Sequence, residues 1–284
     1  MSKVRIVTDV TANLDPELVA RHRITLLPVE IRLGDEKFLI RQDGGREKLF
    51  RHMAKSAVQP CQATIPTRAI QSAYERLSHE TDEILVILGS SKLSRAYQRA
   101  QAATRPFLGR CRIAILDSMT ASWGQGLMVE AAAQAAAQGQ SLDEIVRLVR
   151  GILPHIYLVF FVERLDFLEQ GGRIGTAQAL LGTMLGIKPL LFVEDGDIVP
   201  LEKVRTRLMA IEKLVNFVDE FATVERLVIL VGPLARESTE LIDELHNQLR
   251  QILPDHEIPV MEYDPVLACH LGPEALGVVV YEGM

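Results

Sequence analysis

Polar side chains follow apolar runs at several points in the first half of the sequence. They are Asp9, Thr11, Ser90, Ser91 and Ser118. Hydroxyls and backbone N–H groups at such positions donate hydrogen bonds, so they suit a carboxylate or another small anion. Ser90 and Ser91 also precede a predicted helix, whose dipole favours negative charge at its start. These loops predict an anion site, although Ser94 in the same turn could simply cap the helix.

The apolar runs before these loops predict strands. Residues 4–8 and 112–116 are short and apolar, and residues 83–88 are apolar enough for a strand buried on both faces. Ligands of open α/β folds bind beyond the C-terminal ends of such strands, which is where the polar loops lie. Residues 24–33 predict one further strand.

Helix signals separate the predicted strands. Asp15 precedes Pro16 as an N-cap precedes the first helical position, and Ser141 with Glu144 forms a capping-box pattern. Further helices are predicted for residues 46–56, 123–138 and a segment that starts near residue 95. Repeated strand-helix units indicate an α/β fold, with a mainly parallel sheet flanked by helices on both sides.

Residues 165–207 predict a short helix, a glycine turn, an apolar helix and a hairpin. Gly171 and Gly172 end the first helix, the apolar residues of 177–185 recur at helical spacing, and Pro189 begins the hairpin. The helix could line a slot for an alkyl chain, but such spacing more often marks an ordinary core helix. Basic residues flank this stretch: Arg173, Lys188, Lys203, Arg205 and Arg207.

The rest of the second half predicts a second α/β domain. Its expected strands are 157–162, 227–231, 260–263 and 277–281, and its further expected helices are 209–221 and 239–252. We therefore expect two α/β domains, residues 1–153 and residues 154–284.

Composition excludes several classes of function. A net charge of -6 lacks the positive field of a nucleic-acid binder, and the sequence contains few aromatic residues for base stacking. No apolar run is long enough for stable membrane insertion, and the N-terminus lacks a signal-peptide pattern. The three cysteines have no metal-binding spacing, so we expect free thiols, no metal and a cytoplasmic location.

Several enzyme motifs are missing from the sequence. It contains no phosphate-binding GxxxxGK[ST], no HExxH, no GxSxG elbow and no complete GxGxxG turn. His270 with Asp9 and Ser90 has the composition of a hydrolytic triad, but any chain of this size contains such residues. We expect a binding protein without catalytic residues and without a cofactor.

The ordered motifs of the second half identify a resemblance. The sequence contains GGRIG at 171–175, IKP at 187–189 and VPLEKVR at 199–205, and near its end His270 is followed by Gly272 and Pro273. This order resembles the DegV family of bacterial fatty-acid-binding proteins. The polar loops of the first half correspond to the TDST, TTSQPS, SSKLSGTY and DSKSVS loops of that family, so the resemblance spans the whole chain.

The resemblance implies a long-chain fatty acid buried between two α/β domains, with its carboxylate near the Thr/Ser loops. The carboxylate-binding residues would be Thr64, Ser90, Ser91 and His270. His270 and Arg205 would act as cations on a phosphorylated head group, and Arg173 would contact a separate fatty acid kinase that makes an acyl-phosphate for phospholipid synthesis. Asp9, Thr11 and Ser118 would be further loop contacts.

Four residues depart from the family pattern: Val10, Ala63, Arg95 and Glu274. Val10 replaces a serine, while Arg95 and Glu274 replace glycines. Alignment on Pro66 places Thr64 at a hydroxyl position of the family, whereas alignment on Pro60 places Ala63 there. These departures bear on how the head group is recognised.

Two other classes of function are compatible with the residues. A standalone enzyme could act on a small carboxylate or phosphate with His270 as acid and base. A transcriptional or assembly module is disfavoured by the acidic balance and by the missing DNA-reading elements. A co-purified lipid would separate the binding protein from both.

Overall fold

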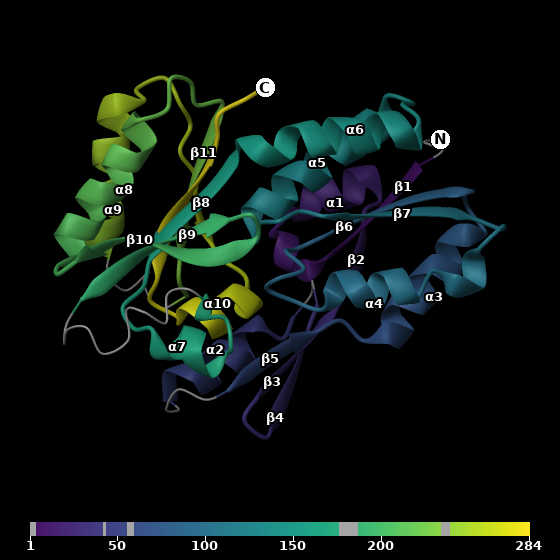
Figure 1. Ribbon diagram of the computed structural model, residues 1–284, viewed down its shortest axis with the longest axis horizontal. Helices are drawn as coiled ribbons and strands as arrows, with labels where there is room; N and C mark the ends of the chain where they lie inside the picture. Colours follow the sequence, from purple (N-terminus) through teal and green to yellow (C-terminus); the bar gives the residue numbers. More distant parts are fainter. Residues whose placement is uncertain (1–3, 42–43, 56–59, 176–186, 234–238) are drawn as a thin grey trace. The chain divides into compact units, whose positions relative to one another are not determined.

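The computed structural model describes residues 4–41, 44–55, 60–175, 187–233 and 239–284. The chain forms two compact units, each with its own sheet and helices (Figure 1). The first unit comprises Met1–Glu47 and Gln62–Pro154, and the second comprises Lys48–Cys61 and His155–Met284. Residues 48–61 therefore group with the second half of the chain, and the two domains expected from the sequence stay a prediction.

A four-stranded parallel sheet forms the centre of the first unit. Its order is β2-β1-β6-β7, with bounds Thr25–Leu27, Val4–Asp9, Glu83–Leu88 and Arg112–Asp117. Each neighbouring pair is parallel. Residues 84–88 of β6 are fully buried, as expected for an apolar strand between two layers of helices. The predicted parallel sheet is confirmed.

Helices cover both faces of this sheet. Figure 1 shows α1, α5 and α6 on one side and α3 and α4 on the other. Their bounds are α1 Pro16–His22, α3 Thr67–Ser78, α4 Ala96–Ala102, α5 Trp123–Ala137 and α6 Leu142–Ile152, with short 3₁₀ turns at Val10–Ala12 (η1), Arg105–Phe107 (η2) and Leu153–His155 (η3). The Asp15 carboxylate accepts from the Glu17 N–H at 2.8 Å, and Ser141 and Glu144 form the predicted capping box.

A small second sheet corrects the prediction of one strand over residues 24–33. The chain leaves the parallel sheet after β2 and begins β3 at Val29, because Pro28 has no N–H for the ladder. This sheet has the order β4-β3-β5, with bounds Glu36–Ile40, Val29–Leu33 and Cys61–Thr64. Helix α2, Arg46–Lys55, lies between β4 and β5 in sequence.

The second unit contains a mixed six-stranded sheet with the order β10-β9-β8-β13-β11-β12. The bounds are Asp197–Val204, Lys188–Glu194, Ile156–Phe161, Leu276–Tyr281, Arg226–Val231 and Val260–Glu262. The predicted hairpin is confirmed as the antiparallel pair β9 and β10. Strand β13 pairs antiparallel with both β8 and β11, and all six of its residues are buried.

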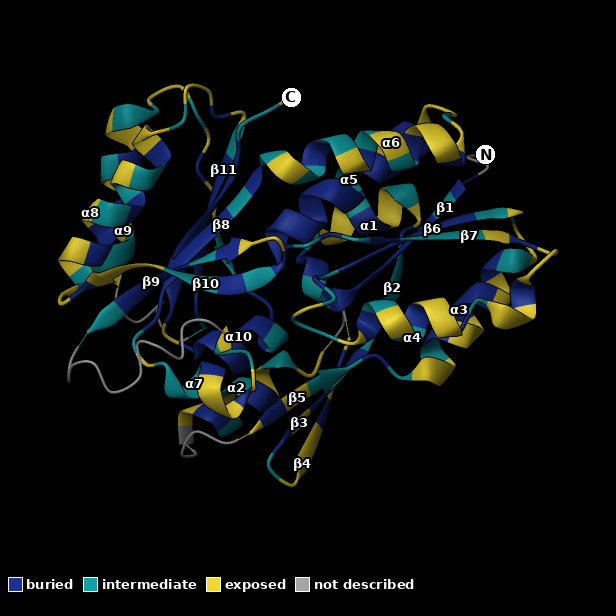
Figure 2. Ribbon diagram, in the orientation of Figure 1, coloured by how far each residue is buried: buried dark blue, intermediate teal, exposed yellow. Residues whose placement is uncertain are grey.

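Among the described residues, the second half of the chain contributes the helices α7 Asp166–Gln170, α8 Arg207–Asp219, α9 Thr239–Ile252 and α10 Pro265–Leu271 to this unit, and most of α2 also groups with it. Helices α8 and α9 bury their apolar faces in a core with the sheet, and Figure 2 shows their outer faces exposed. The predicted apolar helix 177–185 lies outside the described residues. Among the helices that the structure describes, none is both long enough and apolar enough to cross a membrane.

Candidate functional site

The end of β1 carries a buried polar network. The Thr11 N–H donates to Asp9 Oδ1 at 2.8 Å, and the Thr11 hydroxyl donates to the same oxygen. The Gln125 amide of α5 donates to the Thr8 hydroxyl at 2.8 Å and to Asp9 Oδ2 at 3.5 Å. Burial raises the pKa of the Asp9 carboxyl, and the hydrogen bonds from Thr11 and Gln125 oppose this in part. Asp9 and Thr11 therefore lie together, with Asp9 engaged inside the protein.

The loops after β6 and β7 are joined by backbone hydrogen bonds. The Ser90 N–H donates to the Thr120 carbonyl at 2.9 Å, and the Ser118 N–H donates to the Leu88 carbonyl at 2.9 Å. Ser90 and Ser118 are each 1% exposed. The structure thus brings two of the predicted polar loops side by side at the C-terminal edge of the parallel sheet, as the strand order requires.

Several polar groups of these loops bond within the protein. The Ser91 N–H donates to both carboxylate oxygens of Asp117 at 3.2 Å, and the Ser118 hydroxyl donates to the Thr120 carbonyl at 3.2 Å. The Ser94 hydroxyl accepts from the Ala96 N–H at 3.0 Å and so engages the start of α4, although the N-cap residue of that helix is Arg95 rather than Ser94. The Ser91 N–H and the Ser118 hydroxyl are thus both engaged within the protein, so neither is available to donate to an anion.

Three buried hydroxyls of the first unit have no hydrogen-bond partner among the described residues: those of Thr64, Thr120 and Ser122. Only Thr64 was predicted as a site residue. It ends β5, and the next residue, Ile65, accepts at its carbonyl from Arg99 of α4 at 3.1 Å. Ser122 adopts a φ of 54°, which non-glycine residues rarely adopt. Because a buried unpaired hydroxyl is costly, these groups are candidates for contacts with a bound molecule.

His270 lies near the end of α10 in the second unit. The helix is fixed at its start by the Asp264 carboxylate, which accepts from the Val266 N–H at 2.7 Å, and at its end by the Tyr263 hydroxyl, which donates to the Gly272 carbonyl at 2.6 Å. His270 is 5% exposed, and its Nδ1 has no partner among the described residues. In the described part of the chain, Nδ1 of the ring therefore makes no hydrogen bond that would fix its orientation.

The charge expected on His270 is corrected by the structure. Burial, with a further contribution from the positive charge of Arg173, lowers the pKa of His270 from 6.5 to about 3. The imidazole is neutral near pH 7, so it can offer a hydrogen bond but not a positive charge.

The glycine turn after α7 approaches this histidine closely. A Cβ on Gly171 would lie 2.6 Å from His270 Nδ1, so only glycine fits there without a shift. Arg173 is half-buried rather than fully exposed, and its guanidinium donates to the Gly171 carbonyl at 2.7 Å. Arg173 and His270 thus belong to one cluster formed by α7, the turn and α10.

The other basic residues of the second unit differ in their surroundings. Arg205 is exposed at the end of the hairpin. Lys188 and Arg207 both pair with Glu163, which accepts from Arg207 Nε at 2.7 Å. Glu163 was not predicted from sequence, because its two partners come from β9 and α8.

The predicted site residues thus form two groups. Thr64, Ser90, Ser91, Asp9, Thr11 and Ser118 belong to the first unit, and His270, Arg173 and Arg205 belong to the second. Among the described residues, no cluster of three or more His, Cys, Asp or Glu side chains could hold a metal ion. All three cysteines are free thiols, as predicted.

Comparison with known proteins identifies the family. The sequence profile described as "Uncharacterised protein, DegV family" matches residues 3–283. The chain belongs to the DegV family. It is 34% identical over 282 residues to a DegV domain-containing protein of Streptomyces coelicolor, and the matched residues make up 98% of each of the two chains.

Solved DegV structures have the same fold. A DegV family protein from Thermus thermophilus, which binds fatty acid, matches with a TM-score of 0.86 and 27% identity over 99% of this chain and 100% of that one. DegV of Bacillus subtilis, a fatty acid binding protein, matches with a TM-score of 0.82 and 26% identity over 99% of this chain and 100% of that one. The family and the α/β fold expected from the sequence are confirmed.

Proposed function

We propose that this DegV family protein binds a long-chain fatty acid and presents its carboxylate to a separate fatty acid kinase. The observation that carries the proposal is the match of nearly the whole chain to DegV proteins that bind fatty acid. Burial of each methylene contributes about 0.8 kcal/mol, so a long acyl chain needs few polar contacts. The carboxylate contacts then mainly set the orientation of the ligand.

The proposed carboxylate contacts are hydroxyls at the ends of strands. Thr64 has a buried hydroxyl without a partner among the described residues, and the buried Ser90 and the half-buried Ser91 follow β6. Asp9, Thr11 and Ser118 would shape this loop region through their own hydrogen bonds. These residues support the proposal because a carboxylate can accept from several hydroxyls at once.

The second unit would supply the remaining head-group contacts. His270 would offer a hydrogen bond from a neutral imidazole, and Arg205 would offer a positive charge to an acyl-phosphate. Arg173 would contact the kinase. In this proposal the kinase supplies nucleotide and Mg²⁺, the protein itself is a non-catalytic subunit, and both act in the cytoplasm.

A standalone enzyme that uses His270 receives no support from the site. A general acid or base works best when its pKa lies near the working pH. Burial keeps the pKa of His270 at about 3, far below neutrality.

The first test is mass spectrometry of the organic extract of the purified protein, with a long-chain fatty acid as the expected result. The second is Thr64→Val, which removes the hydroxyl at nearly constant volume. We expect fatty-acid affinity to fall by about tenfold, with unfolding free energy unchanged or raised, because the hydroxyl has no partner in the part of the chain that the structure describes. Thr67→Val, at an exposed position, is the control. Equal affinities for the two variants would refute the proposed role of Thr64.

The kinase contact has its own test. Arg173→Ala should leave fatty-acid affinity unchanged but slow phosphorylation of the bound acid by a fatty acid kinase from the same organism. Arg164→Ala is the control, because Arg164 is an exposed arginine of the same region that pairs with Asp166. Loss of lipid binding by Arg173→Ala, with normal turnover by the kinase, would exclude this role.

A further inference from the structure

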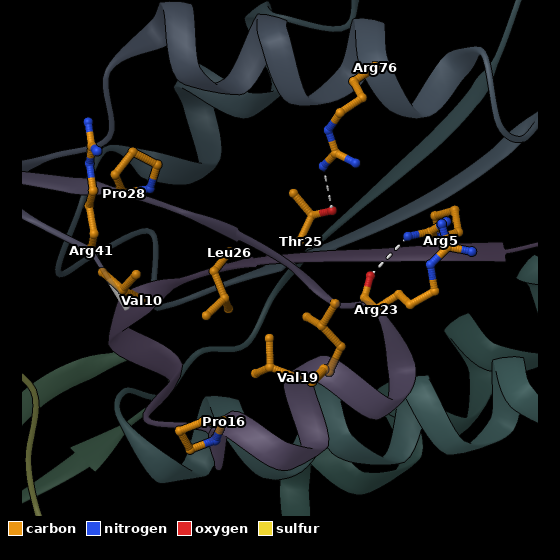
Figure 3. Close-up of a pocket in the computed structure, with 12 residues that line it drawn as sticks. Arg5, Val10, Pro16, Val19, Arg23, Thr25, Leu26, Pro28, Arg41 and Arg76 are labelled. Atoms are coloured by element: carbon orange, nitrogen blue, oxygen red, sulfur yellow. Dashed lines mark hydrogen bonds between the residues drawn. The ribbon is translucent and has the colours of Figure 1, made fainter. Parts of the chain in front are cut away.

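An open pocket of about 820 Å³ lies within the first unit and reaches the β1 loop at Val10. It is lined by residues of β1, η1, α1, β2 and α3, together with Arg23, Ile24, Pro28 and Arg41 (Figure 3). None of the nine predicted site residues lines it. The pocket lies at β2, which is an edge strand of the parallel sheet.

Three arginines of this pocket share one carboxylate. Glu80 pairs with Arg5, with Arg76 at 3.4 Å and with Arg23 at 3.6 Å. Three guanidinium charges against one carboxylate leave two formal positive charges in the cluster. Burial lowers the pKa of Arg5, and the neighbouring charges of Arg23 and Arg76 lower it further while Glu80 acts in the opposite direction. The three guanidiniums therefore repel one another, and the single carboxylate compensates their positive charge only in part.

Two of these guanidiniums are held in place by further hydrogen bonds. Arg5 donates to the Arg23 carbonyl at 3.0 Å, and Arg76 donates to the Thr25 hydroxyl at 3.0 Å (Figure 3). Arg23 and Arg76 keep side-chain exposures of 61% and 54%, so their remaining N–H groups can reach a ligand. An arranged set of donors loses little entropy on binding, and guanidinium groups suit phosphate oxygens.

The rest of the pocket is mainly apolar. Val10, Val19 and Leu26 lie between the arginine cluster and Arg41, which stands at the opposite side of the view in Figure 3. Val10 stands where the family pattern has a serine, so this chain adds an apolar surface at that position. A ligand that fills the pocket would thus meet positive charge at one end and aliphatic side chains beside it.

We propose that this pocket binds an amphiphilic phosphate monoester, with the phosphate on Arg5, Arg23 and Arg76 and the apolar body on Val19 and Leu26. A phosphate monoester carries between one and a half and two negative charges near neutral pH, which matches the excess of two positive charges in the cluster. A carboxylate would leave one of those charges unmatched. The pocket differs in residues and in ligand charge from the proposed fatty-acid site.

The test uses n-octyl phosphate below its micelle concentration, with inorganic phosphate and n-octanol as separate probes. Titration calorimetry is done on the full-length protein saturated with hexadecanoic acid, so that the probe cannot enter the fatty-acid site. We expect saturable binding of octyl phosphate, and Arg23→Gln should weaken it by about tenfold through loss of a charge-assisted hydrogen bond. Arg21→Gln is the matched control, because Arg21 is an exposed arginine of α1, two residues before Arg23, that does not line the pocket.

A second variant tests the apolar part of the pocket. Leu26→Ala should weaken octyl phosphate by about fivefold and leave inorganic phosphate unaffected, because only the apolar body contacts Leu26. If inorganic phosphate binds as tightly as octyl phosphate, the pocket is a plain phosphate site, and the proposed amphiphilic ligand is refuted. Absence of saturable binding, or equal weakening by Arg21→Gln, would overturn the site itself. Octyl phosphate binding in a protein that binds no fatty acid would support this inference while refuting the proposed function.

Discussion

His270 provides the sharpest prediction, because its environment makes protonation costly. Its pKa is lowered from 6.5 to about 3. A fall in the pKa from 6.5 to about 3 corresponds to about 5 kcal/mol of free energy disfavouring the charged form in the folded protein. The unfolded chain takes up the proton below about pH 6.5 whereas the folded chain does not, so stability is lost as the pH falls from about 6.5 toward 3. Between about pH 7.5 and 4.5 the loss from this residue is about 3 kcal/mol.

The perturbation that isolates this effect is His270→Asn, which removes the titrating group. Denaturant unfolding at both pH values should show the variant losing about 3 kcal/mol less stability than the wild type over the same range. His79→Asn is the control, because the His79 side chain is 68% exposed. Equal pH dependence of His270→Asn and wild type would refute the reasoning.

An NMR titration of the imidazole carbons tests the same reasoning directly. His270 should stay neutral until about pH 4. Arg173→Gln should raise its pKa without restoring 6.5, because burial is the larger cause of the shift. A wild-type His270 that titrates near its ordinary pKa would contradict the burial that the structure assigns to it.

Three further predictions concern stability and reactivity. Gly126→Ala would place a Cβ 2.2 Å from the Ala12 carbonyl oxygen, so we expect a loss of about 2 to 3 kcal/mol in unfolding free energy. Gly44→Ala is the control and should change this free energy little, because a Cβ at Gly44 would meet no atom within 4 Å. Glu163→Gln should cost about 2 kcal/mol because two partly buried cations lose their shared carboxylate. Glu202→Gln loses only an exposed pair with Lys213 and should cost far less; equal losses in denaturant melts would contradict this ranking. The three cysteines are buried, so an aromatic disulfide reagent should label them slowly in the native protein and rapidly in denaturant; fast native labelling would contradict that burial.

Local signals predicted those elements whose ends are marked in the sequence. Asp15 with Pro16 began a helix as expected, and the apolar run of β6 was a fully buried strand. The same signal occurs at Asp264 and Pro265, where it begins α10, but that helix was not predicted. By contrast, the division of residues 24–33 between two sheets depends on which strand each half meets, and Pro28 was its one local sign.

The site was predictable to the extent that it depends on strand ends. Ser90 and Ser118 lie at the same edge of the sheet because parallel neighbours end together. The hydroxyls of Thr120 and Ser122, which have no partner among the residues that the structure describes, were not predictable, because whether a hydroxyl finds a partner depends on packing across the fold. The neutral state of His270 was not predictable either, because the burial that lowers its pKa depends on helices far apart in sequence.

Strand β13 has a consequence for the biosynthesis of this protein. It lies between β8 and β11, although it follows both of them in sequence. The ribosome makes the chain from its N-terminus, so β8 and β11 are synthesised before β13. Their backbone N–H and C=O groups that face β13 stay unpaired until that strand is made. The first sheet needs nothing beyond β7 and can form earlier. We therefore expect the second unit to complete its sheet only after β13 has left the ribosome, and nascent chains that end before β13 to be the form most prone to aggregation and most in need of chaperones.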